Sequence, residues 1–393
     1  MLDGYLKRYR TELLESVMPF WLENSVDRDF GGFFSCLDRV GEVYGTRKYV
    51  WQQGRAVWML SRLYRTVEPR PEWFEAARTG AEFLQRYGVD SGGRCYFSLT
   101  REGRPVHYQR KPYSAVFTAL GFLEYGLASG EKAYQDEAIE LFWRIRSWIE
   151  FPGMIGRPIL SGEPADSKLA DVMVSAMLGM EFLDALSDRR YLRVVEDSMN
   201  SARLHADPEK HILMESVPPN GAKLYGTPDS RLCCPGHSIE VVWLLLKHLK
   251  RYPDSGWQRE LLTILEGTLE FAWDREFGGL YYFKDIKGKP TLPLESGMKL
   301  WWPHTEAIHA VILAYSVTGE QKWLDWLARI DEYAFRHFAD PEHGEWFGYC
   351  DRRGGLTNDC KGNNYKGMFH VPRFLLFSIQ ALEEIAHRGS VGA

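Results

Sequence analysis

The feature of this sequence that most constrains its fold is a unit that returns along the whole chain. Each copy has a glycine-rich turn, a short hairpin and then an apolar run with helical spacing. The apolar runs begin near residues 50, 113, 168, 236, 302 and 370, so the repeat is about 63 residues long. A second helical stretch, such as 133–148 or 323–337, fills each interval. Six pairs of helices are therefore predicted.

The hairpins are recognisable in four places. Each combines glycines for a tight turn, alternating aromatic residues for a strand, and a second glycine turn before the return strand. They cover residues 29–41, 90–103, 276–288 and 343–354, and residues 211–221 form a weaker fifth copy. We therefore expect short β-hairpins between the helix pairs.

The two helices of a pair differ in character. One is apolar nearly all round, as in 241–246 and 374–379, whereas the other carries many charges, as in 187–200. The amino-terminal helix, about 6–23, completes the set, and no Pro/Ser/Gly-rich linker interrupts it. The pattern predicts an all-α fold with one domain over residues 1–393. This domain is an (α/α)6 barrel of six inner and six outer helices, with its hairpins at one mouth.

Charge and composition restrict the partners. The net charge is −5 and the pI is near 6.2, with basic residues scattered among acidic ones. The sequence therefore shows no cluster of basic residues that would bind nucleic acid or an anionic membrane. No stretch approaches the roughly eighteen apolar residues of a transmembrane helix, and the amino terminus is amphipathic and acidic, unlike a signal peptide. We expect a cytoplasmic protein that acts on a small molecule.

The six cysteines are interpreted as free thiols. They show neither C-x-x-C pairs nor a grouping with histidine that would make a zinc site. Cys233 and Cys234 are adjacent and stand shortly before His237, but thiols in loops are common, so a structural role is favoured. No metal site and no cofactor are predicted.

The most informative stretch reads Lys-Leu-Trp-Trp-Pro-His-Thr-Glu and runs from Lys299 to Glu306. Pro303 suits the first position of a helix, so a helix should begin beside Trp302, with the glutamate in its first turn. Aromatic faces can cover the apolar faces of a sugar ring while a carboxylate contacts its hydroxyls. Taken alone, a buried helix start is the more frequent explanation of such a stretch.

Two more helix starts carry a histidine. His237 and Glu240 are three residues apart after a Pro-Gly turn, which puts both on one helix face. His370 stands just ahead of a proline that can begin another helix. A lone histidine in such a place is more often structural. If all inner helices run the same way, however, their amino ends open at one mouth and these side chains meet there.

A fourth helix start carries an arginine. Arg55 shares a stripe with Trp51 and Trp58, where a lone arginine is often simply stacked. In one cavity with two histidines, it could instead stabilise an enolate oxygen. Helix amino ends disfavour imidazolium, so His237 is expected to be neutral and able to accept a proton. These groups are suited to proton abstraction next to a carbonyl, while the two glutamates could orient the histidines, bind hydroxyls or help to open a sugar ring.

Six motifs are spread over the chain. They are WQQGRAVW at 51–58, PGHSIE at 235–240, FAWDREFGGLYYF at 271–283, KLWWPHTE at 299–306, FADPEHGEWFGY at 338–349 and GMFHVPR at 367–373. Together they resemble the N-acylglucosamine 2-epimerases, the renin-binding-protein family. The resemblance implies an (α/α)6 barrel, a homodimer, and interconversion of N-acetyl-D-glucosamine and N-acetyl-D-mannosamine. ATP as an allosteric effector stays open, because residues 152–162 match the corresponding family stretch poorly.

The resemblance also implies roles for single residues. The family's arginine falls on Arg55, its two catalytic histidines on His237 and His370, and its site glutamates on Glu240 and Glu306. We therefore expect two-base proton transfer at C2 of the ring-opened sugar. The expected catalytic residues are His237, His370, Glu306 and Arg55, and the expected substrate-binding residues are Trp302, Glu240, Trp51, Trp58 and Lys299.

Three alternatives stay open at this point. Epimerases and aldose–ketose isomerases of unacylated sugars (mannose, glucose, cellobiose) share the barrel but carry a further histidine on the third inner helix, and this chain has none between His107 and His205. A glycoside hydrolase would use Glu240 and Glu306 as acid and base, for which two histidines and an arginine are poor tools. A non-enzymatic partner protein would need an exposed apolar stripe, and the seven-residue spacing that begins at Leu169 breaks down too soon.

Overall fold

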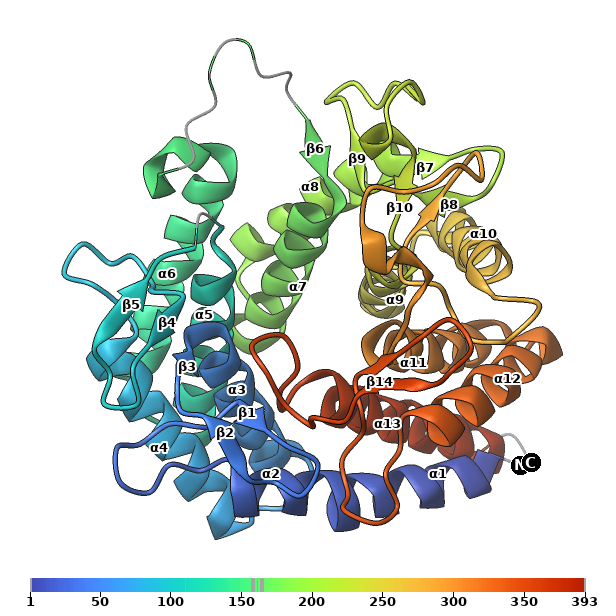
Figure 1. Cartoon of the computed structure of the whole chain (residues 1–393). Helices are drawn as coiled ribbons and strands as arrows, with labels where there is room; N and C mark the ends of the chain where they lie inside the picture. Colours follow the sequence, from blue (N-terminus) through green and yellow to red (C-terminus); the bar gives the residue numbers. More distant parts are fainter. Residues whose placement is uncertain (1, 110, 157–159, 161, 163–165, 392–393) are drawn as a thin grey trace.

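The computed structural model describes residues 2–109, 111–156, 160, 162 and 166–391. Within this part of the chain the helices form two concentric rings (Figure 1). The inner ring consists of α3 (Val50–Thr66), α5 (Tyr113–Ser129), α7 (Leu169–Leu186), α9 (Pro235–Arg251), α11 (Trp301–Thr318) and α13 (His370–Val391). The outer ring consists of α4 (Pro71–Tyr87), α6 (Lys132–Glu150), α8 (Arg189–His205), α10 (Ser255–Ala272), α12 (Gln321–His337) and one helix built from α1 (Leu2–Thr11), the π-helical η1 (Glu12–Val17) and α2 (Met18–Asn24). For the described residues, this confirms the predicted (α/α)6 barrel.

The character of the two rings follows the apolar pattern of the sequence. In α11 every residue from Trp301 to Ala314 is buried. In α12 only one face is buried, with Trp323, Leu327 and Ile330 on it. The main hydrophobic core extends from the amino-terminal helix to α13, so we keep the proposal of a single domain. None of the helices in the described ranges is both long and apolar enough to cross a lipid bilayer.

Two glycines bring α3 and α5 into backbone contact. A Cβ atom on Gly54 would lie 2.3 Å from the carbonyl oxygen of Phe117, and one on Gly121 would lie 2.9 Å from the oxygen of Gly54. Arg55 follows Gly54 directly in α3. The close approach of the two helices therefore also determines where this arginine enters the barrel.

We expect Gly54→Ala to destabilise the fold by about 1–3 kcal/mol, because the added methyl group overpacks a backbone contact. Gly4→Ala in α1 is the matched control, since a Cβ atom there meets nothing within 4 Å. Alanine is favoured over glycine in a helix by up to about 1 kcal/mol, so the control should be neutral or slightly stabilised. Chemical denaturation of both variants measures the difference, and equal stabilities would contradict the close helix contact.

Short strands occupy the loops at the end where the inner helices begin. Four antiparallel pairs lie within one loop or beside a helix end. These pairs are β1 (Cys36–Leu37) with β2 (Val43–Gly45), β4 (Ser98–Leu99) with β5 (Pro105–His107), β7 (Ala206–Asp207) with β8 (Ile212–Leu213), and β13 (Tyr349–Cys350) with β14 (Leu356–Asn358). The loops also contain the 3₁₀ helices η2 (Pro152–Ile155), η3 (Asp229–Arg231) and η4 (Leu294–Gly297).

A second set of strand pairs links successive repeats. These pairs are β3 (Lys48–Tyr49) with β4, β6 (Ser167–Lys168) with β9 (Ser216–Val217), β10 (Leu232–Cys233) with β11 (Lys284–Asp285), and β12 (Lys299–Leu300) with β13. Each of β3, β6, β10 and β12 leads into an inner helix, so the pairing ties the start of that helix to the following loop. The prediction of self-contained hairpins at 276–288 and 211–221 is wrong, because the strands of these segments pair outside them: β11 pairs with β10, β8 with β7, and β9 with β6.

Three aspartates connect the loops further. Each follows an outer helix, accepts a backbone N–H of its own turn, and binds a buried lysine together with an arginine from the turn of a neighbouring hairpin. In the first group, Asp27 lies 2.9 Å from Lys48 Nζ and 2.9 Å from Arg101 Nη2. The other two groups are Asp274 with Lys299 and Arg352, and Asp340 with Lys361 and Arg39. We call these groups the Asp–Lys–Arg clasps.

Candidate active site

The starts of three inner helices bring two histidines to one tryptophan. His237 is in the first turn of α9, and His370 begins α13. The ring centroid of Trp302, in α11, lies 5.3 Å from that of His237 and 5.7 Å from that of His370. Gly236 makes room for this contact, because a Cβ atom there would lie 2.4 Å from the Trp302 ring. The structure thus brings these three predicted site residues together.

One ring nitrogen of His370 is held by a carboxylate. Its Nδ1 lies 2.8 Å from Glu306 Oε1. Because a carboxylate only accepts, Nδ1 carries the proton and Nε2 keeps its lone pair. Burial, with the guanidinium groups of Arg373 and Arg55 nearby, lowers the pKa of His370 well below its ordinary value. His370 is therefore neutral at neutral pH, and 12% of its side chain stays exposed.

A buried arginine joins the two glutamates of the predicted site. Arg373 donates through Nη2 to Glu240 Oε1 and to Glu306 Oε1, both at 2.6 Å. The second oxygen of Glu306 accepts from Trp243 Nε1 at 2.8 Å. The sequence interpretation missed Arg373. The signal for it was the pair of glutamates expected on inner helices, since buried carboxylates require a cationic partner.

His237 has the opposite electrostatic setting. Its Nδ1 lies 2.9 Å from Oε1 of Glu215, a residue between β8 and β9. Burial opposes a charge on the ring, but Cys234 and the Glu215 carboxylate raise the pKa of His237 well above its ordinary value. The expectation of a neutral His237 is wrong, because a carboxylate in direct contact outweighs the roughly half charge of a helix end. Glu215 was missed because its loop has no periodic pattern.

Arg55 lies in a cage of three aromatic rings. Its Cζ is 4.5 Å from the ring centroid of Trp51, 4.1 Å from that of Phe117 and 4.8 Å from that of Phe369. Its Nε is buried without a hydrogen-bond partner among the described residues. Burial and the charge of Arg373 lower the pKa of Arg55 to about 9, so the guanidinium is still charged at neutral pH. A buried cation with an unused donor is suited to receive an oxygen of a ligand.

The two predicted tryptophans of α3 differ in position. Trp51 covers Arg55 and donates its Nε1 to the carbonyl oxygen of Asn364 at 2.8 Å. Trp58 is 3% exposed and packs against Phe377 in the core. The structure therefore places Trp51 beside Arg55 and leaves Trp58 in the packing between inner helices.

Lys299 is part of a clasp, and its hydrogen-bond and ion-pair partners include neither His237 nor His370. Its side chain is fully buried, and its Nζ lies 3.1 Å from Asp274 Oδ2, 3.3 Å from the oxygen of Gly279 and 3.7 Å from the ring centroid of Tyr281. Burial lowers the pKa of Lys299 to about 8, although the aspartate opposes this. The predicted role of Lys299 in substrate binding is wrong, because all its contacts hold the loop that precedes α11.

All six cysteines are free thiols, as predicted, and the structure shows that all of them are buried. Cys234 nevertheless belongs to a group of potential metal ligands. Its sulfur, a carboxylate oxygen of Glu215 and a ring nitrogen of His237 all lie within 4.8 Å of one another. The prediction that no cysteine groups with a histidine is therefore wrong. The glutamate completes the group from a different loop, which spacing in the sequence could not show.

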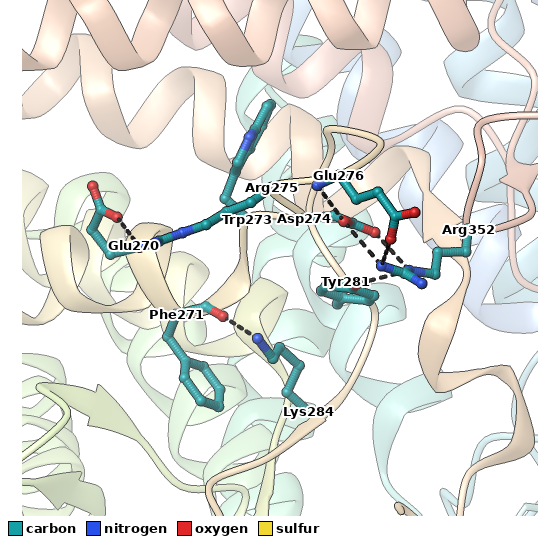
Figure 2. A pocket seen from close by; sticks show the side chains of 9 residues that line it. All are labelled: Glu270, Phe271, Trp273, Asp274, Arg275, Glu276, Tyr281, Lys284 and Arg352. Carbon is teal, nitrogen blue, oxygen red and sulfur yellow. Dashed lines mark hydrogen bonds and ion pairs between the residues drawn. The ribbon is translucent and has the colours of Figure 1, made fainter. Parts of the chain in front are cut away.

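A separate pocket of about 440 Å³ lies beside the loop that follows α10 (Figure 2). Its wall includes the clasp between Asp274 and Arg352, and Glu276 binds the same arginine at 2.9 Å. Lys284 donates to the carbonyl oxygen of Phe271 at 2.6 Å. The residues that line this pocket include neither of the two histidines, so it belongs to the loop scaffold and is distinct from the site at Trp302.

The sequence matches known proteins over nearly its whole length. A family model described as N-acylglucosamine 2-epimerase (GlcNAc 2-epimerase) matches residues 32–371. The chain belongs to this family. As a member of the N-acylglucosamine 2-epimerase family, it is an enzyme of the isomerase class.

Individual relatives agree with this assignment. The N-acylglucosamine 2-epimerase of Mus musculus is 40% identical over 397 residues, which cover 98% of this chain and 94% of the mouse protein. The human protein of the same name is 38% identical over 399 residues, covering 98% of this chain and 92% of its own. The structure of cellobiose 2-epimerase from Bacillus thermoamylovorans superposes with a TM-score of 0.83 at 20% identity, over 96% of this chain and 99% of that one. This last likeness shows that the two proteins share a fold.

Proposed function

We propose that this epimerase interconverts N-acetyl-D-glucosamine and N-acetyl-D-mannosamine. The observation that supports the proposal is the pair of imidazoles beside Trp302, each with its Nδ1 bound to a glutamate. Inversion at C2 requires that one proton leaves one face of the carbon and another arrives at the opposite face. Two separately held imidazoles are suited to this task, whereas one fixed imidazole reaches a single face.

Each group at the site has a proposed task in the reaction. His370, neutral and with Nε2 free, removes the proton from C2 of the ring-opened sugar in one direction. His237 serves the opposite face, and the two roles exchange in the reverse direction. Arg55 stabilises the enolate oxygen with its unused donor, and Trp302 covers an apolar face of the sugar.

The two inner glutamates orient these groups. Glu306 keeps the proton of His370 on Nδ1, and Arg373 holds Glu306 and Glu240 in place. This arrangement disfavours a glycoside hydrolase, which requires one carboxylic acid as the proton donor to a leaving oxygen. Here both carboxylates are acceptors for the same Arg373 nitrogen at 2.6 Å.

The N-acyl sugar is preferred over unacylated ones for two reasons. The animal relatives at about 40% identity carry the N-acyl sugar in their name, whereas the cellobiose 2-epimerase from Bacteroides fragilis is 24% identical. In addition, this chain has no histidine on α7, where the epimerases and isomerases of unacylated sugars carry one. Epimerisation or isomerisation of mannose, glucose or cellobiose is the second candidate.

A labelling experiment tests the proposed function. The chain is incubated in heavy water with N-acetylmannosamine, N-acetylglucosamine, mannose or cellobiose, and the products are followed by NMR. We expect the two N-acetyl sugars to reach the same mixture with deuterium at C2. Faster conversion of mannose or cellobiose would favour the second candidate. Cleavage of cellobiose, or epimerisation without deuterium, would contradict proton transfer at C2.

The compartment, the oligomeric state and the partners of the enzyme are proposed from its composition and its family resemblance. We propose that it is a cytoplasmic homodimer that binds neither nucleic acid nor membranes. Six unpaired thiols suit a reducing compartment, and a net charge of −5 offers no attraction to polyanions. Whether ATP acts as an effector depends on residues 152–162. Residues 157–159 and 161 of this segment lie outside the described ranges.

A further inference from the structure

Three potential metal ligands of different types meet at the start of α9. Glu215 Oε1 is 2.9 Å from His237 Nδ1, and the Cys234 sulfur completes a group whose donor atoms all lie within 4.8 Å of one another. Carboxylate oxygen, thiolate sulfur and imidazole nitrogen are the three ligand types that Zn²⁺ takes in proteins. The group therefore offers one ligand of each type.

The spacing of the donors fits a tetrahedral ion. With bonds of about 2.0–2.3 Å to the metal, the donors of such a site lie roughly 3.3–3.7 Å apart. The Glu215 Oε1–His237 Nδ1 distance of 2.9 Å lies below this range, and no two donor atoms of the group are more than 4.8 Å apart, so rotation of the side chains of Glu215 and His237 would bring the donors to one ion. The sulfur and nitrogen donors favour Zn²⁺ and Co²⁺ over Mg²⁺ and Ca²⁺, which prefer oxygen.

The exposure of the three side chains allows access of an ion. Cys234 immediately precedes α9. This residue is fully buried, whereas the side chains of Glu215 and His237 are 17% and 24% exposed. An ion can therefore enter past the two exposed ligands. It then meets the sulfur beneath them.

We propose that Glu215, Cys234 and His237 form a site for one Zn²⁺ ion, with the fourth position left for water or a sugar oxygen. Binding of the ion stands on this geometry alone. Its consequence rests on the proposed function: an ion on Nδ1 of His237 would leave the ring's remaining proton on Nε2, so this nitrogen could no longer accept a proton from C2. Zinc would then act as a reversible inhibitor of epimerisation.

The binding test uses the full chain, reduced and stripped of metal with a chelator, and titrated with Zn²⁺ by calorimetry and equilibrium dialysis. We expect one ion per chain. Cys234→Ala should weaken binding at least about tenfold, because loss of a ligand has a larger effect than loss of an outer partner. Cys233→Ala is the matched control. Cys233 is adjacent and equally buried, but it belongs to a separate hydrophobic cluster with Ile212 and Val217.

A spectroscopic test identifies the ligand directly. Bound Co²⁺ should show a thiolate-to-metal charge-transfer band in the wild-type chain and in Cys233→Ala, and no such band in Cys234→Ala or Cys234→Ser. Wild-type affinity for Zn²⁺ in both Cys234 variants, or a cobalt spectrum without a sulfur band, would overturn the proposal. Circular dichroism confirms that each variant is folded.

An activity assay tests whether zinc bound at this site inhibits epimerisation. Added Zn²⁺ should suppress epimerisation, and a chelator should restore it. If one ion binds to the Cys234 group while turnover is unchanged, inhibition through His237 is overturned and the role of that histidine is contradicted as well. If the chain proves to catalyse another reaction, the calorimetric and cobalt results still decide whether the metal site exists.

Discussion

Replacement of His370 by alanine is expected to lower epimerisation by about 10² to 10⁴, the range that a general acid–base group contributes. The same loss is expected for His237→Ala. Each imidazole contacts the Trp302 ring and is fixed by its own glutamate, so neither can take the place of the other. Steady-state turnover of N-acetylmannosamine measures the effect. Circular dichroism should be unchanged, since both side chains are partly exposed at helix starts.

An isotopic readout separates the two histidines. Each variant should still exchange deuterium into the epimer whose C2 proton faces the remaining imidazole, although net epimerisation is lost. His343→Ala is the matched control, because its side chain is 32% exposed on a loop and its nearest acidic partner is at 3.6 Å. Near-normal epimerisation in either site variant would contradict the two-base mechanism. Exchange into both epimers by a single variant would contradict it as well.

Asp274→Ala is expected to destabilise the fold by about 3–5 kcal/mol, the effect of removing one partner of a buried ion pair. The side chains of Asp274 and Lys299 are 2% and 0% exposed, so the variant leaves a buried lysine without its counter-charge. Although burial opposes the charge of this aspartate, its hydrogen bond from Arg352 and its other partners hold the pKa of Asp274 well below the ordinary value. Chemical denaturation measures the loss.

Two comparisons make this test specific. Glu332→Ala removes an ion pair whose side chains are both 67% exposed, and the expected change is at most about 1 kcal/mol. The double variant Asp274→Ala/Lys299→Met should recover part of the stability, because no unpaired charge is left in the core. Equal effects of the two single substitutions would show that the buried clasp contributes no more than a surface pair.

The inner helices could be located from sequence because several local signals agree. The apolar runs were expected from about residues 302 and 370, and α11 and α13 begin at Trp301 and His370. Pro303 and the all-round apolar pattern indicate the same boundary independently. Since the inner helices are parallel, knowledge of their starts was sufficient to predict that the two histidines meet at one mouth, where the structure shows both beside Trp302.

Partners that come from outside the helices could not be predicted in this way. Glu215 lies between two strands of two residues each, which carry no periodicity. Together with Cys234 it nevertheless raises the pKa of His237, whereas the helix dipole alone predicts the opposite direction. Lys299 is close to the tryptophan pair in the sequence, but its side chain forms an ion pair with Asp274 in one of the clasps. Proximity along the chain was therefore misleading at this position.

The Asp–Lys–Arg clasps have a consequence for exchanging loops between relatives of this protein. In each clasp the aspartate belongs to one repeat and the arginine to another, and the pair of Asp340 with Arg39 joins the sixth repeat to the first. A loop transplanted by itself would bring its own arginine but leave the acceptor of that arginine behind. The smallest transferable module is therefore a loop together with the aspartate-bearing turn that its arginine binds. For Asp340 and Arg39, these two parts lie at opposite ends of the gene.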